Sequence, residues 1–325
     1  MGKRIKLLAI CVLLTSVSIL SGCSENVNLD NTQKKKNIAL IVKMKNGDYW
    51  KTVKMGAEVA AREFDVNVDF NAPDDEEDIE GQIRLVNEAL EKKVGALILA
   101  ASDYKALAEV TEKAYNQKIP VIIIDAEVNT DRIHSFIGTD NRDAGIKAGE
   151  KLVELAGTDS RIAIMSFVKG TGNAEQREEG LMSVISKYPQ IKVVAKEYSL
   201  SDTKLANQLT KKIISEKGEI DAIVALNAIS SIGVAQAIYE MNLAGRVKVI
   251  TFDSTPEEIE FIEKEVIQAT IIQNPFSMGY LGVKYAVEAM EGKKIPKRID
   301  TGSKAIDKNN MYLPANQKLV FPFVK

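Results

Sequence analysis

From residue 37 onward, short apolar runs alternate with amphipathic stretches. Runs such as 38–42 and 121–124 are typical of buried strands, whereas residues 75–92 carry Ile79, Ile83, Val86 and Leu90 at helical spacing. The first set of predicted elements has strands over 38–42, 66–70, 96–99 and 121–124, and helices over 50–64, 75–92 and 107–117.

The pattern then starts again. The second set has strands over 161–167, 191–197, 222–226, 247–252 and 267–272, and helices over 174–187, 203–216, 231–241, 256–263 and 278–290. Apolar strands separated by helices indicate parallel sheets covered on both faces. Two successive sets predict an α/β protein with two doubly wound parallel-sheet lobes, and such sheets bind ligands beyond the carboxyl ends of their strands.

The N-terminus carries a different pattern, which predicts where the protein works. Lys3, Arg4 and Lys6 precede an almost wholly apolar stretch over 7–20, as in a secretory signal. The stretch is short for a membrane span, and it ends in Leu-Ser-Gly-Cys at 20–23, which resembles a bacterial lipobox. We therefore expect residues 1–23 to be a lipoprotein signal peptide and lipobox. Cys23 would carry the lipid that anchors the protein to the cell membrane on its extracytoplasmic side.

An ordinary signal peptide with a chance cysteine is the alternative interpretation. Residues 24–36 are polar and lack apolar periodicity, so they predict a solvated tether. After cleavage no second cysteine remains to form an intramolecular disulfide, because Cys11 lies in the signal.

Composition narrows the classes of function. The chain has 325 residues, of which 45% are hydrophobic, and this is long enough for two separate cores. A formal net charge of −2, with lysine and arginine dispersed along the chain, argues against nucleic acid as a partner.

Polar and aromatic residues follow the predicted strands. Polyols need a fixed array of donors and acceptors for their hydroxyls, and a flat ring can cover the apolar face of a sugar. Each residue alone also has a structural interpretation, as a helix cap or as a packed aromatic. The candidate ligand-binding residues are Lys43, Tyr49, Trp50, Asp125, Asn173, Arg177, Asn227, Asp253 and Gln273.

The charges among these candidates favour a neutral ligand. Lys43 and Arg177 would oppose Asp125 and Asp253, whereas a phosphate or a dicarboxylate needs a cationic excess.

Five stretches together resemble the ribose/galactose-type periplasmic sugar-binding proteins, which are type I solute-binding proteins of ABC transporters. The stretches are 37–42, 119–125, 138–141, 252–256 and 269–275. The resemblance implies that a monosaccharide, a pentose or a hexose, is captured by hinge closure and delivered to an ABC permease.

The resemblance also implies the limits of the lobes and the roles of the candidates. An N-terminal lobe would comprise 37–139 plus 274–301, and a C-terminal lobe 140–273 plus 302–325. A three-strand hinge would lie near 139–140, 273–274 and 300–301. Tyr49 and Trp50 would stack on the sugar, and the polar candidates would bind its hydroxyls, with Asn173 near Arg177.

Departures from the family pattern argue against ribose itself. Ala126 stands where ribose binders have an arginine, Leu200 where they have a stacking phenylalanine, and Lys43 where they have a small polar residue. With a lysine at position 43, the chain is also similar to the receptors for the autoinducer-2 furanone, although Ala174 stands where those have a glutamine. A different pentose, a hexose, a polyol or autoinducer-2 therefore remains open.

Three other classes of protein are compatible with parts of the pattern. A repressor with this fold would need an N-terminal helix-turn-helix, where this chain has a secretion signal. An enzyme is not expected, because no nucleophile elbow or metalloprotease motif occurs and His134 is predicted to lie at the surface. The third class, a sugar receptor that reports to a membrane histidine kinase, is not separated from transport by the sequence.

No cofactor, metal or catalytic residue is predicted. The acidic run 74–78 suggests either a cation site or, more simply, the acidic N-terminus of the helix expected over 75–92.

Overall fold

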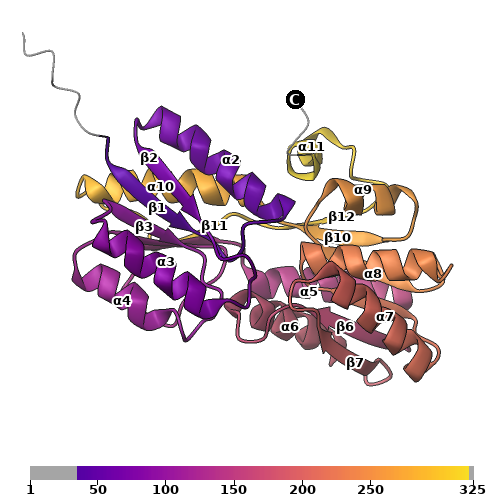
Figure 1. Cartoon of the computed structure of the whole chain (residues 1–325). Helices are drawn as coiled ribbons and strands as arrows, with labels where there is room; N and C mark the ends of the chain where they lie inside the picture. The colour runs from indigo at the N-terminus through magenta and orange to yellow at the C-terminus, as the bar shows by residue number, and fades with distance from the viewer. Residues whose placement is uncertain (1–34, 322–325) are drawn as a thin grey trace, which may run out of the picture. The chain divides into compact units, whose positions relative to one another are not determined.

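The computed structural model describes residues 35–321, in which two six-stranded sheets each carry helices on both faces (Figure 1). The predicted fold class, two doubly wound α/β lobes, is confirmed. The predicted signal peptide, the lipobox with Cys23 and most of the tether lie outside the described residues, as do 322–325. Within 35–321, no helix combines the length and the apolar character that crossing a membrane requires.

All strand pairs of the first sheet are parallel, in the order β11-β5-β4-β3-β1-β2. Its strands are β1 (Asn37–Ile41), β2 (Asn67–Asn71), β3 (Ala96–Leu99), β4 (Val121–Ile124), β5 (Ser135–Gly138) and β11 (Arg298–Asp300). Helices α2 (Asp48–Glu63) and α10 (Pro275–Met290) cover one face, and α3 (Ile79–Glu91) and α4 (Ala108–Asn116) cover the other (Figure 1).

The second sheet has the order β12-β10-β9-β8-β6-β7, and only its edge strand β12 runs antiparallel to its neighbour. Its strands are β6 (Arg161–Ser166), β7 (Lys192–Tyr198), β8 (Ala222–Ala225), β9 (Lys248–Phe252), β10 (Ala269–Ile272) and β12 (Lys304–Ile306).

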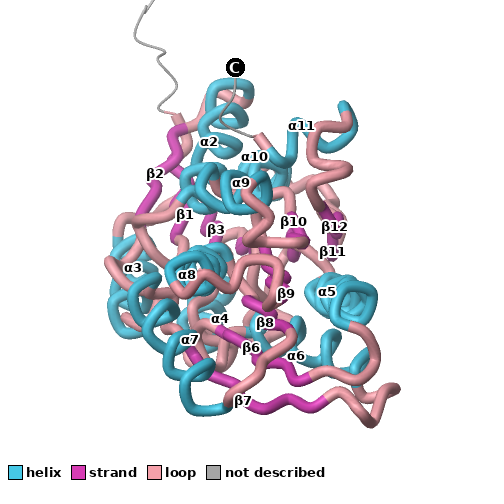
Figure 2. Tube along the Cα trace, turned by 90° about the vertical axis from the view of Figure 1, so that its right-hand side faces the viewer, coloured by secondary structure: helices cyan, strands magenta, loops and turns pink. Residues whose placement is uncertain are grey.

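Helices also sandwich this sheet. Figure 2 shows α7 (Thr203–Lys217) and α8 (Ala228–Glu240) on one side of the strands and α5 (Asn141–Ala156) and α6 (Gly172–Ile185) on the other. Helices α9 (Pro256–Glu263) and α11 (Pro314–Val320) complete the layer of α7 and α8.

The continuous apolar strands explain why both faces are covered. Every residue of β3, β4, β8 and β10 is buried, so each strand has apolar side chains on both sides of its sheet. Four separate apolar clusters result, one on each face of each sheet.

The chain passes between the sheets three times. The crossings lie between β5 and α5, between β10 and α10, and between β11 and β12. They coincide with the predicted hinge segments near 139–140, 273–274 and 300–301. The finer lobe boundaries stay a prediction.

One helix begins later than predicted. Helix α3 starts at Ile79, because the Asp78 side chain accepts a hydrogen bond from the Gly81 N–H at 2.8 Å and so caps the first turn. Residues 75–78 therefore form a loop before the helix rather than its first turn, and this frees Glu76 to point elsewhere.

Helix α5 was not predicted, because its buried face is made of small residues rather than large apolar ones. The face includes Ala144, Gly145, Ala148 and Gly149. A Cβ on Gly145 would lie 2.2 Å from the carbonyl oxygen of Arg177 in α6. Glycine at this position thus allows the two backbones to approach closely, and the approach fixes where Arg177 sits.

We predict that Gly145→Ala lowers the free energy of unfolding by about 1–3 kcal/mol, because the new methyl group forces α5 and α6 apart. Urea denaturation of the purified chain measures the change. Gly172→Ala is the control, since a Cβ there meets no atom closer than 3.6 Å. Equal stability of the two variants would contradict the prediction.

Candidate ligand-binding cleft

A cavity of about 510 Å³ lies where the carboxyl ends of strands from both sheets face each other. All nine candidates line it: Lys43, Tyr49, Trp50, Asp125, Asn173, Arg177, Asn227, Asp253 and Gln273. The structure therefore brings together residues separated by up to 230 positions in the sequence. That they bind a ligand stays a prediction.

Asp125 and Asp253 occupy equivalent positions in the two sheets. Each directly follows a buried strand, β4 or β9, and each has a left-handed backbone, with φ values of 61° and 78°. Aspartate tolerates this conformation better than most residues, although the backbone is still strained. The tight turn aims both carboxylates into the cavity instead of along the strands.

Lys43 is buried and holds two carboxylates of the first lobe. Its Nζ lies 3.2 Å from Glu76 Oε1 and 3.5 Å from Asp125 Oδ2, and it donates to Asn173 Oδ1 at 3.1 Å. Asn173 belongs to the second lobe, so the ammonium group also links the lobes. With two ion pairs and one hydrogen bond, Lys43 positions its neighbours, and little of its bonding capacity is left for a ligand.

Glu76 is a site residue that sequence analysis missed. It is buried, although it belongs to the acidic run interpreted as a helix terminus. Besides pairing with Lys43, its Oε2 accepts a hydrogen bond from Ser201 Oγ at 2.5 Å. The loop before α3 supplies this carboxylate. The one feature of the sequence that could have indicated it is Lys43, because a buried lysine needs a carboxylate partner.

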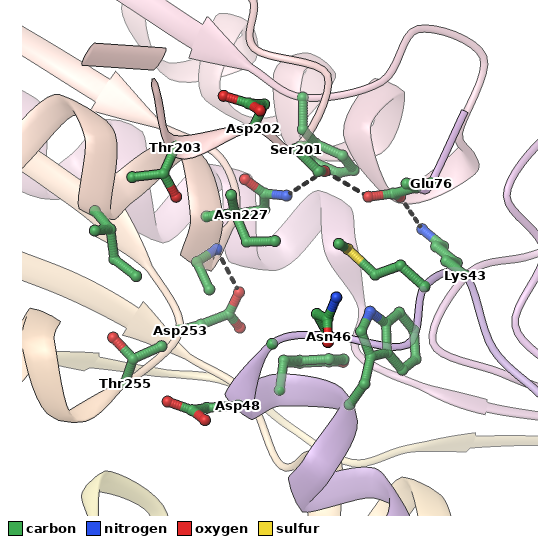
Figure 3. Close-up of a pocket in the computed structure, with 18 of the residues that line it drawn as sticks. Lys43, Asn46, Asp48, Glu76, Ser201, Asp202, Thr203, Asn227, Asp253 and Thr255 are labelled. Carbon is green, nitrogen blue, oxygen red and sulfur yellow. Dashed lines mark hydrogen bonds and ion pairs between the residues drawn. The ribbon is translucent and has the colours of Figure 1, made fainter. Parts of the chain in front are cut away.

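Figure 3 shows how one line of bonds crosses the cleft from lobe to lobe. Asn227 Nδ2 donates to Ser201 Oγ at 3.0 Å, Ser201 bonds Glu76, and Glu76 pairs with Lys43. Asn227 also caps α8, because its Oδ1 accepts from Ser230 N at 2.9 Å.

The lobes also touch beyond this line. The Tyr104 N–H donates to the carbonyl oxygen of Gly170 at 3.0 Å, and Gln176 Nε2 donates to Glu127 Oε2 at 3.1 Å. The protein therefore contributes several interlobe bonds of its own, independent of what the cavity binds.

Arg177 lines the cavity and keeps one donor without a partner among the described residues. Its Nε donates to Asn141 Oδ1 at 2.9 Å, its Nη1 donates to the carbonyl of Leu226 at 2.7 Å, and its guanidinium lies 4.6 Å from the Phe252 ring centroid. Within the described part of the chain, Nη2 is buried without a hydrogen-bond partner. A fully fixed guanidinium with one open donor is suited to a ligand hydroxyl.

Gln273 and Asp253 are joined by a hydrogen bond, and both offer acceptor oxygens. Gln273 Nε2 donates to Asp253 Oδ1 at 2.7 Å, which leaves Gln273 Oε1 buried with no partner among residues 35–321. Asp253 Oδ2 accepts from the Ala228 N–H at 3.0 Å. Burial raises the pKa of Asp253 above its ordinary value, while the nearby Arg177 opposes the rise.

Tyr49 is fixed by the first-lobe aspartate. Its hydroxyl donates to Asp125 Oδ1 at 2.7 Å, and burial, followed by the charge of Asp125, raises the pKa of Tyr49 well above its ordinary value. The phenol therefore stays neutral. The adjacent Trp50 packs edge-on against Tyr49, with ring centroids 5.1 Å apart.

The second lobe contributes an aromatic that sequence analysis did not identify. Phe167, directly after β6, lines the cavity and is 1% exposed. It escaped notice because the predicted strand included it, which hid its place at the strand end. Leu200, predicted to replace the second-lobe aromatic, is instead 37% exposed and lies outside this cavity.

The charge of the cleft differs from the predicted balance of two against two. The lining has seven carboxylates against three cations, because Glu76 and four aspartates nearer the exposed end, Asp48, Asp74, Asp75 and Asp202, were not counted. Such a wall repels phosphates and carboxylates more strongly than predicted.

Neither metal coordination nor histidine chemistry is apparent at the site. No cluster of three or more His, Cys, Asp or Glu side chains suited to a metal occurs among the residues that the structure describes. His134 is half-buried away from the cavity lining, and its Nδ1 accepts a hydrogen bond from the Val121 N–H at 3.0 Å. Burial lowers its pKa, so it is neutral at physiological pH.

Two sheet-based lobes that face each other across a polar, aromatic-lined cavity define a two-lobed solute-binding protein. Residues 38–294 match the family described as periplasmic binding protein domain, and the chain belongs to this family. The resemblance inferred from the sequence is thereby confirmed.

Known relatives have names that refer to sugars. The D-allose-binding periplasmic protein of Escherichia coli (strain K12) is 27% identical over 267 residues, which cover 79% of this chain and 86% of that protein. An ABC transporter solute-binding protein from Agrobacterium vitis, solved with bound D-fucose, is 31% identical with a TM-score of 0.86, covering 88% of this chain and all of that one.

A third similar structure is described as the XylFII–LytSN complex. It is 30% identical with a TM-score of 0.80, and the match covers 85% of this chain and 99% of that one. The first two of these relatives are named as binding proteins.

We predict that Lys43→Met lowers the free energy of unfolding by about 3–5 kcal/mol, because Glu76 and Asp125 would stay buried without their cation. The control is Lys45→Met. Lys45 pairs with Asp74 at 2.7 Å, but the two side chains are 59% and 81% exposed, so its loss should cost less than about 1 kcal/mol. Similar unfolding curves for both variants would refute a structural role for Lys43.

Proposed function

We propose that this protein is an extracytoplasmic, lipid-anchored solute-binding protein that captures a neutral sugar or polyol between its lobes and delivers it to an ABC permease. The observation that carries the proposal is that two residues lining the cavity, Arg177 and Gln273, each keep a buried polar atom without a partner among the described residues, and that Gln273 bonds the carboxylate of Asp253. A hydroxyl both donates and accepts, so it can satisfy an open donor such as Arg177 Nη2 or an open acceptor such as Gln273 Oε1.

Aromatic and charged groups support the same ligand class. Tyr49 and Trp50 from the first lobe and Phe167 from the second offer apolar surface for the C–H faces of a ring. The excess of carboxylates disfavours phosphates and dicarboxylates, and carboxylates accept strongly from hydroxyls.

The mechanism follows from where the groups lie. The ligand first binds one lobe, and rotation at the three crossings brings up the other lobe until both sets of groups surround it. The line from Asn227 to Lys43 forms only when Ser201 reaches Glu76, so binding and closure support each other. The closed surface is what the membrane partner would recognise.

A sugar receptor for a membrane histidine kinase is the second candidate. The neighbour described as the XylFII–LytSN complex favours keeping it, since that protein of the same fold was solved with a second component. Autoinducer-2 remains a further ligand candidate. Genes adjacent to this one separate the roles: permease and ATPase genes support transport, and a kinase gene without them supports sensing.

We predict that Asp253→Ala weakens sugar binding by about 1.5–3 kcal/mol, or roughly ten- to a hundredfold in Kd, because a charged hydrogen-bond acceptor is lost. A thermal-shift screen of the purified chain against pentoses, hexoses, polyols and autoinducer-2 selects the ligand, and calorimetry measures its affinity. Asp69→Ala, an exposed change on β2, is the control. If no compound in the screen binds, the proposal fails.

We predict that Cys23→Ala moves the protein from the membrane fraction to the soluble extracytoplasmic fraction, because the thiol that would carry the lipid is gone. Fractionation and immunoblotting measure the distribution. Cys11→Ala should leave the protein in the membrane fraction. Retention of the Cys23 variant at the membrane would exclude anchoring through this residue.

A further inference from the structure

The cavity has more room than a single sugar ring uses. A hexose, with six carbons and six oxygens, occupies roughly the space of six water molecules, about 180 Å³. The cavity volume is about 510 Å³. More than half of this volume would remain beside a bound monosaccharide. The space is this large although hydrogen bonds already join the two lobes at several places.

The two ends of the cavity differ in character. At the deep end, Arg177, Asp253 and Gln273 are buried, and two of them carry open polar atoms. At the other end, Asp202 and Lys204 are exposed. A ring held by the deep groups therefore leaves the exposed end free.

A second hollow of about 320 Å³ adjoins that exposed end. It shares part of its wall with the main cavity, including Met44, Glu76 and Ser201, and continues to Leu205 and Gln208 on α7. Apolar and polar side chains are mixed in its lining, which suits a second ring with both C–H and hydroxyl surface.

Ser201 and Glu76, which share a hydrogen bond, line both spaces. Leu200 and Ser201 both have left-handed backbones, with φ values of 56° and 53°, which is unfavourable for residues that carry a side chain. Backbone hydrogen bonds from Leu200 to Phe167 and from Asp202 to Ser199, together with the side-chain bonds of Ser201, hold this segment in place. A ligand hydroxyl that replaces the Ser201–Glu76 bond could reach from one space into the other.

We propose that the ligand is a glycoside, a sugar ring carrying a second ring, with the first ring at Arg177 and Gln273 and the second directed toward Leu205 and Gln208. This inference rests on the proposed sugar-binding function and names the substrate class of that site. Both spaces are lined by polar groups that can bond hydroxyls and by apolar side chains, and such a ligand requires both.

The test compares free sugars with their glycosides on the purified full chain by calorimetry. The probes are D-glucose, D-galactose and D-xylose, and the α and β p-nitrophenyl glycosides of each. At least one glycoside should bind about tenfold or more tightly than its free sugar.

A matched pair of variants locates the second ring. Gln208 is exposed on α7 and lines the second hollow but not the main cavity. Gln208→Trp should fill the second hollow, weaken glycoside binding about tenfold and leave the affinity for the free sugar within about twofold. Gln208→Arg, which fills the same hollow with a flexible side chain, should affect the two affinities in the same way as Gln208→Trp. Glu216→Trp, exposed two turns further along α7, should change neither affinity.

The failures are distinguishable. A free sugar that binds as tightly as all its glycosides, or Gln208 variants that affect both ligands equally, overturns the glycoside proposal and leaves the sugar-binding function standing. If neither these probes nor any compound of the wider screen binds, the proposed function itself falls, and the inference with it.

Discussion

The buried ammonium group of Lys43 is the interaction on which the cleft depends. It lies among Glu76 and Asp125, which come from two loops of the first lobe, and Asn173, which comes from the first turn of α6 in the second. Two carboxylates packed this closely under apolar residues would repel each other without a cation between them. Lys43 therefore lets the first lobe present acidic groups to the cavity, and through Asn173 it ties them to the second lobe.

The remaining polar groups divide into those whose bonds are used within the protein and those with an atom that has no partner among residues 35–321. Asn227 caps a helix and bonds Ser201, and Tyr49 is bound to Asp125, so much of their capacity is used within the protein. Arg177 and Gln273 each keep one buried atom without a partner in the described chain. The position of Arg177 depends on Gly145, because this glycine allows α5 and α6 to come into close contact. Recognition thus depends on helix packing behind the site as well as on the side chains that face it.

The sequence indicated the repeated strand–helix order well, because strands buried on both faces are continuous apolar runs. It did not indicate α5, whose buried face is alanine and glycine, nor the three-residue strands β11 and β12, which are too short to show a period. At the site, the strand-end rule located all nine candidates at the cavity wall, since topology alone brings carboxyl ends together. It missed Glu76 and Phe167 because a boundary error of a few residues moved each into a helix or a strand. Which charges pair, and which polar atoms stay open, depends on side-chain geometry that spacing does not encode.

The bonds that the protein itself makes between its lobes, such as Tyr104 to Gly170 and Gln176 to Glu127, have a consequence for signalling. Each lowers the free-energy cost of the closed form, whether or not a ligand is present. Under the proposed function, in which a membrane partner recognises the closed form, the strength of these contacts would set the output in the absence of ligand. A chain with stronger contacts would close at lower ligand concentrations, but more of it would be closed without ligand. A chain with weaker contacts would be less often closed without ligand and would need more ligand to close.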